Sequence, residues 1–157
     1  MINYIFDVVE SQLKSSGIFQ YIGHDYGQLT LFSRPPVRFP VAIYDVTQVD
    51  YTNLSLSSQT GTALISIKIA HKAVNRSSQS SIVEHSRDVF EFIEQANKLI
   101  HSKGTKYLTP LTRTSMRKLT LADDMVGYEL TYRCTFNDDG AAPTFTAVET
   151  DSATISF

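Results

Sequence analysis

Two stretches of the sequence alternate between apolar and polar residues, the pattern of strands that have one buried and one solvent-exposed face. In residues 63–69 the apolar positions are Ala63, Ile65, Ile67 and Ile69. In residues 126–136 they are Val126, Tyr128, Leu130, Tyr132, Cys134 and Phe136. Strands of this kind need a second layer over one face only, so the pattern predicts a sheet with helices on one side.

Two predicted helices can supply that layer, because each repeats apolar residues at intervals of three or four. The first stripe consists of Ile2, Ile5, Phe6, Val9 and Leu13. The second consists of Ile82, Val89, Phe90, Ile93, Ala96 and Ile100. Gly17 follows the first helix as a left-handed C-cap, and Ser81 and Glu84 fit a capping box at the start of the second, which Gly104 closes.

Three further segments are predicted to be extended. Residues 41–49 are β-branched and aromatic, which favours a largely buried strand. Residues 109–121 predict a strand whose register stays open, because Arg113 and Arg117 interrupt its apolar parity. Residues 18–40 contain a double proline and predict an extended edge or loop segment.

Polar stretches connect these elements. Residues 51–61 and 72–80 predict loops, and Asp123–Asp124 predicts the turn of a hairpin between the last two strands. The sum predicts a single α+β domain with a mainly antiparallel sheet of four to five strands and two amphipathic helices packed on one face. We expect this domain to span residues 1–139. Residues 140–157 belong to a C-terminal region that carries acids and no bases. We expect them to form an arm or an added strand.

Composition limits the class of protein. The chain has 157 residues, 42% of them hydrophobic, and a formal net charge of −2, which indicates one folded domain. Lys and Arg number 14 against 16 Asp and Glu, so the basic excess of a dedicated nucleic-acid binder is missing. A single cysteine and an N-terminus without a basic leader predict folding in a reducing cytoplasm. No apolar run approaches the ~20 residues that span a bilayer.

The sequence carries no nucleophile elbow, phosphate-binding glycine loop or zinc ligand pattern. We therefore predict no enzyme activity, no cofactor and no metal site. His24–Asp25, expected in a loop, is the pair that could serve a small-molecule or catalytic site together with Arg113. Cys134 falls on the apolar parity of its strand, which predicts a buried and unreactive thiol.

Arg113, Arg117 and Arg133 in the last two strands admit two interpretations. Each can form a salt bridge inside the domain, with Glu129 as one available partner, or an ion pair between subunits. The loops at 51–61 and 72–80 are the other candidate contact surfaces, because long loops on a compact scaffold often bind partners. The first loop carries three apolar residues among polar ones, Tyr51, Leu54 and Leu56.

The order of several short motifs is similar to that of a known group of phage proteins. The motifs are DYGQL from Asp25, FP at Phe39–Pro40, YTN from Tyr51 to Asn53, QTG from Gln59, and LTRTSMRK from Leu111 to Lys118. Between an N-terminal helix and a final strand ending at Asp138, this order resembles prophage-encoded tail terminator and neck (tail completion) proteins, notably those of Bacteroidetes-like bacteria. The resemblance covers about residues 1–139.

This resemblance implies a structural role without catalysis. Similar proteins form rings, often hexamers, that cap the tail tube and join it to the head connector. The implied partners are other copies of the chain, tail tube proteins and head-connector proteins, with no specific nucleic-acid binding and no membrane. The implied location is the bacterial cytoplasm during assembly and then the tail or neck of the virion.

A ring of this kind needs contact surfaces, and we expect them among the loop residues and strand arginines described above. The interface residues are expected to be Tyr51, Asn53, Leu54, Leu56, Gln59, Arg113, Arg117 and Arg133. Asp123 and Asp124, or the acidic arm, are expected to face the lumen of the ring, where like charges let DNA pass without sticking.

Two other interpretations stay open. The chain could be a small-molecule-binding or enzymatic α+β domain that uses the His24–Asp25 loop with Arg113. It could also be a monomeric adaptor that binds one protein partner through the loops at 51–61 and 72–80.

Overall fold

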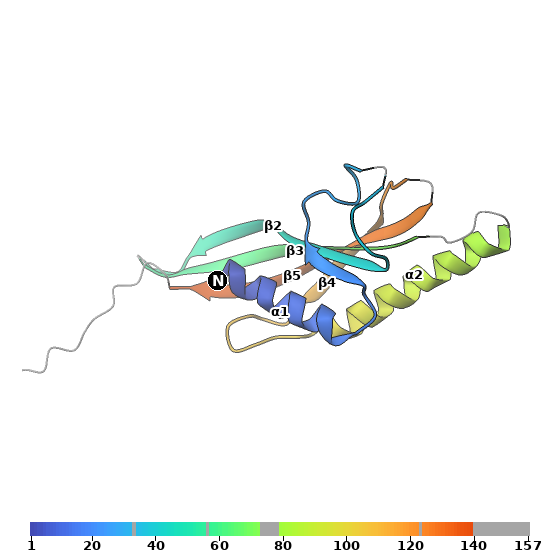
Figure 1. Ribbon diagram of the computed structural model, residues 1–157. Helices are drawn as coiled ribbons and strands as arrows, with labels where there is room; N and C mark the ends of the chain where they lie inside the picture. Colours follow the sequence, from blue (N-terminus) through green and yellow to red (C-terminus); the bar gives the residue numbers. More distant parts are fainter. Residues whose placement is uncertain (33, 56, 73–78, 123, 140–157) are drawn as a thin grey trace, which may run out of the picture.

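The structure is a computed structural model that describes residues 1–139 except 33, 56, 73–78 and 123 (Figure 1). In chain order its elements are α1 (Ile2–Ser15), β1 (Tyr21–His24), β2 (Val41–Asn53), β3 (Gln59–Lys72), α2 (Gln79–Ile100), β4 (Thr112–Lys118) and β5 (Met125–Asp138). The five strands form one sheet in the order β1-β2-β3-β5-β4. β1 and β2 are parallel and the other neighbours antiparallel, which confirms the predicted fold class.

Both helices pack on one face of the sheet, where the alternating residues of the central strands form the main core (Figure 1). The helices contribute Ile5, Val9 and Leu13 from α1 and Val89, Ile93, Ala96 and Ile100 from α2. The central strands contribute Ala63, Ile65, Ile67 and Ile69 from β3 and Leu130, Tyr132, Cys134 and Phe136 from β5. Each fully buried large side chain contributes about 1.5–3 kcal/mol relative to exposure, so this layer supplies most of the driving force for folding.

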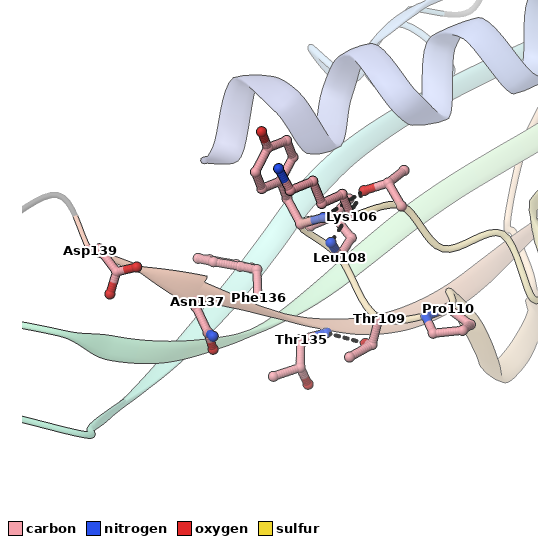
Figure 2. A pocket seen from close by; sticks show the side chains of 10 residues that line it. Lys106, Leu108, Thr109, Pro110, Thr135, Phe136, Asn137 and Asp139 are labelled. Carbon is pink, nitrogen blue, oxygen red and sulfur yellow. Dashed lines mark hydrogen bonds between the residues drawn. The ribbon is translucent and has the colours of Figure 1, made fainter.

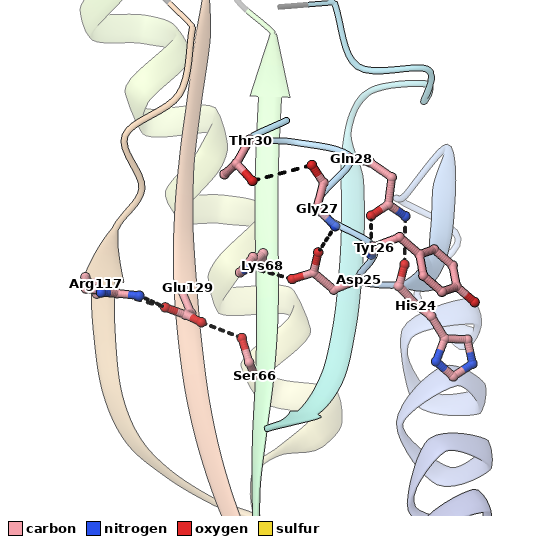
Figure 3. A network of polar contacts seen from close by, with 10 residues as sticks. All are labelled: His24, Asp25, Tyr26, Gly27, Gln28, Thr30, Ser66, Lys68, Arg117 and Glu129. Atoms are coloured by element: carbon pink, nitrogen blue, oxygen red, sulfur yellow. Dashed lines mark hydrogen bonds and ion pairs between the residues drawn. The ribbon is translucent and has the colours of Figure 1, made fainter. Parts of the chain in front are cut away.

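A smaller apolar cluster lies on the opposite face, under the segment that joins β1 to β2. Its buried members are Leu29, Val41, Ile43 and Ala70. The start of this segment is tied to β3 by an ion pair between Asp25 and Lys68 (Figure 3). The remainder of this face is mainly polar, so the sheet has one helix-covered face and one face that is only partly covered.

The segment at 18–40 differs from the expected edge or loop because it contains β1, which pairs Tyr21 with Val41 and His24 with Tyr44. The strand has only four residues, all half-buried, and one of them is Gly23. A run of four residues is too short to show the alternation of apolar and polar residues that predicts a strand. Its pairing depends on β2, which lies about twenty residues further along the chain.

The predicted loop at 51–61 is wrong for most of its length. β2 continues to Asn53, β3 begins at Gln59, and these two residues are paired across the hairpin, so only residues 54–58 connect the strands. Polar residues form strands here because β3 pairs with β2 on one side and with β5 on the other, while the side chains remain in solvent. β5 extends the ladder further, since Gln59 also pairs with Asp138.

The expected glycine cap is found at the C-terminal end of α1 but not at that of α2. Gly17 follows α1 with a φ of +65° and donates its N–H to Lys14 O at 3.2 Å, as a left-handed cap does. α2 ends at Ile100, and Ser102, not Gly104, takes the left-handed conformation with a φ of 63°. Gly104 is instead a point of close approach, where a Cβ atom would lie 3.1 Å from the backbone nitrogen of Pro110.

Candidate functional site

The free end of the β2–β3 hairpin and the adjacent end of β5 form a projecting part of the sheet, which we call the sheet tip (residues 50–55, 57–60 and 136–139). It extends beyond the N-terminal end of α1 (Figure 1). The last four residues of β2 are all exposed. Four of the predicted interface residues meet here: Tyr51, Asn53, Leu54 and Gln59. Leu56 belongs to the connecting turn and lies outside the described residues.

Hydrogen bonds hold the sheet tip together. Gln59 Nε2 donates to Asn53 Oδ1 at 2.6 Å. The backbone N–H of Leu54 donates to Ser58 O at 2.9 Å, and the Ser58 hydroxyl donates to Asp139 Oδ1. These polar groups are paired within the chain and therefore need no partner protein to satisfy them.

Two large apolar side chains of the sheet tip face solvent. Leu54 is 60% exposed and Tyr51 is 47% exposed. The Tyr51 ring meets the buried Phe136 ring edge-on, with centroids 6.2 Å apart, so it is positioned by the protein rather than free to rotate. A positioned aromatic residue beside an exposed leucine is typical of a protein-contact surface.

An open pocket of about 550 Å³ lies beside the sheet tip, between residues 105–110 and the end of β5 (Figure 2). Thr109 and Thr135 exchange two hydrogen bonds of 2.8 Å there. Tyr107 stands at the pocket, 53% exposed, with Lys106 Nζ 5.5 Å from its ring centroid. This pocket could not be predicted from the sequence, because its one distinctive residue is a tyrosine in a polar connecting segment.

β4 forms the outer edge of the sheet, and all seven of its residues are exposed. Its basic residues include Arg113 and Arg117, and charges on an edge strand discourage uncontrolled pairing with other chains. An irregularity between Arg113 and Ser115 shifts the register. Arg113 therefore pairs with Tyr132 on the helix-covered face and Arg117 with Glu129 on the other face, which explains why simple parity could not define this strand.

Arg117 forms a salt bridge inside the domain with Glu129, which was the first of the two possibilities for this residue. Its Nη2 lies 2.5 Å and its Nε 3.1 Å from Glu129 Oε2, while Ser66 Oγ donates to Glu129 Oε1 at 2.6 Å (Figure 3). Burial alone raises the pKa of Glu129, but the hydrogen bonds from Ser66 and Arg117 outweigh this effect and hold the pKa below its ordinary value. Arg113 and Arg133 have no ion pair among the described residues.

Of the two acids expected to face a lumen, only Asp124 is described. It lies in the turn between β4 and β5, where Met125 N–H donates to Ala122 O at 2.9 Å. Its carboxylate forms an ion pair with Lys72 Nζ at 3.1 Å. Asp123, the predicted arm at 140–157, and residues 73–78 of the predicted second loop lie outside the described residues.

His24 and Asp25 do not form a joint site. His24 is the last residue of β1, not a loop residue, and its ring packs on Phe6 of α1 with centroids 4.5 Å apart. Asp25 turns to the other face of the sheet, where it pairs with Lys68 (Figure 3). Arg113 lies on β4, at the opposite end of the strand order. The structure thus separates the three groups that the enzymatic alternative requires.

Cys134 is 2% exposed, and burial raises the pKa of its thiol to about 11. The predicted burial is confirmed, and a thiol with so high a pKa carries almost no reactive thiolate at neutral pH. The described part of the chain contains no cluster of three or more His, Cys, Asp and Glu residues that could hold a metal ion. None of the described helices is long and apolar enough to cross a membrane.

The fold of this chain is similar to that of a protein of known structure. The sequence matches no family model and no curated protein. Among solved structures, a chain from the virion of a native gene transfer agent (GTA) particle is similar, with a TM-score of 0.51 and 10% sequence identity. The match covers 83% of this chain and 92% of that chain. At this identity the likeness shows the fold alone.

Proposed function

We propose that this protein is a structural component of a phage-like virion, and that it acts as a tail terminator. Copies of the chain close into a ring, a hexamer in the assembly we favour, that ends the growing tail tube and offers a surface to the head connector. The observation that supports this proposal most is the fold shared with a virion chain over 83% of this chain and 92% of that one.

The arrangement of exposed surfaces fits such a role. A ring subunit needs different surfaces for its two neighbours and for the tube, because ring contacts are heterologous. We assign the sheet tip, with Tyr51 and Leu54, to contact with the tube or connector. We assign the arginines of β4 and β5 that have no ion pair within the described residues, Arg113 and Arg133, to ion pairs at the boundary between subunits.

We assign Asp124, together with Asp123 beside it in the sequence, to the wall of the lumen. Acidic groups there would keep DNA from adhering as it passes. Measuring retention of the purified protein on a DNA column tests this assignment. We expect elution at low salt, and tight retention at physiological salt would contradict it.

Light scattering coupled to size-exclusion chromatography tests ring formation. We expect a mass of six times 17.6 kDa, with a ring visible by electron microscopy, and a monomer at high concentration would count against the ring. Deleting the gene from a phage that encodes the chain tests the role itself. Because an unterminated tube continues to polymerise, we expect tails of excessive and variable length.

The same deletion separates the competing functions. Tails of normal length that lack heads would contradict the terminator role and indicate a neck protein. Normal infectious particles would contradict a structural role altogether. Complementation with Leu54→Ser should fail to restore tail length, whereas Thr47→Ser, an exposed change on β2 outside the sheet tip that keeps the hydroxyl, should restore it.

A further inference from the structure

The segment between β1 and β2 presents large apolar side chains to solvent. Tyr26 and Leu31 are each 74% exposed and Phe32 is 52% exposed, while Leu29 is turned inward and buried. Apolar residues that gather in one exposed segment, rather than being scattered, mark a contact surface. We call Leu31 and Phe32, with the exposed Arg34 that follows them, the knob.

Hydrogen bonds fix the turn that leads into the knob (Figure 3). Gly27 has a φ of +79°, and its N–H donates to Asp25 Oδ1 at 2.8 Å. The Leu31 N–H donates to Gly27 O at 2.8 Å. Gln28, only 7% exposed, donates from Nε2 to His24 O at 2.7 Å. The exposed side chains therefore stand on a preorganised turn, which lowers the entropic cost of binding a partner.

A pocket of about 430 Å³ opens at the surface of α2, and we call it the socket. Its lining consists of Ile18, Glu91, Phe92, Glu94 and Gln95. Ile18 and Phe92 are half-buried and supply an apolar surface, whereas Glu91 and Glu94 are exposed. Neither glutamate takes part in an ion pair with a described residue. The socket thus combines an apolar surface, from Ile18 and Phe92, with about as much polar surface from its acidic and amide groups.

The knob and the socket lie on opposite faces of the sheet. The knob segment is anchored through Leu29 to the smaller cluster, while α2 packs on the main core (Figure 1). One copy therefore cannot fill its own socket. A contact between the knob of one copy and the socket of another is heterologous, and repeated contacts of this kind close into a ring when the rotation allows.

We propose that the knob of each subunit docks into the socket of the next copy of this chain. Leu31 and Phe32 cover the apolar surface of Ile18 and Phe92, and Arg34 pairs with the glutamates beside them. The charges are complementary, because residues 26–44 contain two arginines and no acid. This inference rests on the proposed ring and names the contact that joins its subunits.

Chemical cross-linking tests the contact, even when association is weak. Leu31→Cys and Gln95→Cys are made in separate full-length chains, one carrying an affinity tag, and the mixture is treated with a short bis-maleimide. Cys134 is buried and does not compete. We expect heterodimers from this pair, and a ladder of multimers from the double variant. Leu31→Cys mixed with Leu54→Cys is the matched control, because Leu54 is exposed at the sheet tip, away from the proposed subunit boundary, and this pair should give only background.

Charge reversal provides the second measurement. Arg34→Glu should weaken self-association at least about tenfold, the loss expected for one well-placed contact. Mixing Arg34→Glu chains with Glu91→Arg/Glu94→Arg chains should restore the contact between them. Heterodimers no more abundant than in the control would overturn the knob-and-socket contact. If light scattering still shows a ring in that case, the ring proposal stands and only this contact is wrong; if both are absent, both fail.

Discussion

The ring of Phe136 on β5 lies directly against the backbone of Gly61 on β3 and occupies the space that a Cβ atom on Gly61 would need. The two residues are paired across the strands, next to the sheet tip. Phe136 is 2% exposed there, with Tyr51 packed on its edge. A glycine beneath an aromatic ring thus allows Phe136 to be buried against β3 at the border of the sheet tip.

Gly61→Ala should destabilise the protein by about 1–3 kcal/mol, because the new methyl group forces Phe136 out of its position. Urea unfolding followed by circular dichroism measures this loss. Thr52→Ala, an exposed change on the neighbouring strand, should stay within about 0.5 kcal/mol of wild type. A Gly61→Ala protein as stable as wild type would show that Phe136 can move without cost.

Tyr132→Phe should lower the free energy of unfolding by about 1–2 kcal/mol. The Tyr132 hydroxyl donates to Asn97 Oδ1 at 3.0 Å and links β5 to α2 inside the core. Removing it leaves a half-buried amide without this donor. In a double-mutant cycle with Asn97→Ala, the double variant should lose less than the sum of the two single changes. Additive losses would contradict a direct interaction.

Glu129→Gln should change how stability depends on pH. The pKa of Glu129 is lowered in the folded protein, so its ionised form contributes stability that is fully present above the pKa of the unfolded chain and is lost as the pH falls through the folded pKa. We expect the variant to be less stable than wild type by about 1 kcal/mol at neutral pH. Unfolding curves at decreasing pH should converge in acid, and a constant difference would contradict the assignment.

Cys134 should resist thiol reagents until the protein unfolds. Its thiol is buried, and burial raises its pKa to about 11. Labelling followed by mass spectrometry should show negligible modification in native buffer and complete modification in denaturant. Leu31→Cys provides the control, because a thiol at that exposed position should react at once. Rapid native labelling of Cys134 would indicate that the end of β5 opens readily.

The conformation of the segment before β2 was accessible to sequence analysis only in part. Gly27 and Asp25 are typical turn residues, and the apolar run at 29–32 is visible in the sequence. Which of its residues point inward depends on the turn and on the ion pair with Lys68, more than forty residues away. Local periodicity carries no information about such a contact, so the knob could not be predicted.

Four features of the protein could be predicted from the order of its residues: the two helices, the central strands β3 and β5, the burial of Cys134 and the α+β class. They follow from the periodic spacing of apolar and polar residues, which reports burial locally. Three others became visible only in the folded molecule: the parallel strand β1, the extension of β2 and β3 into the sheet tip, and the placing of His24 and Asp25 on opposite faces. Strand pairing and register depend on residues distant in the chain, because their hydrogen bonds and packing override local preference.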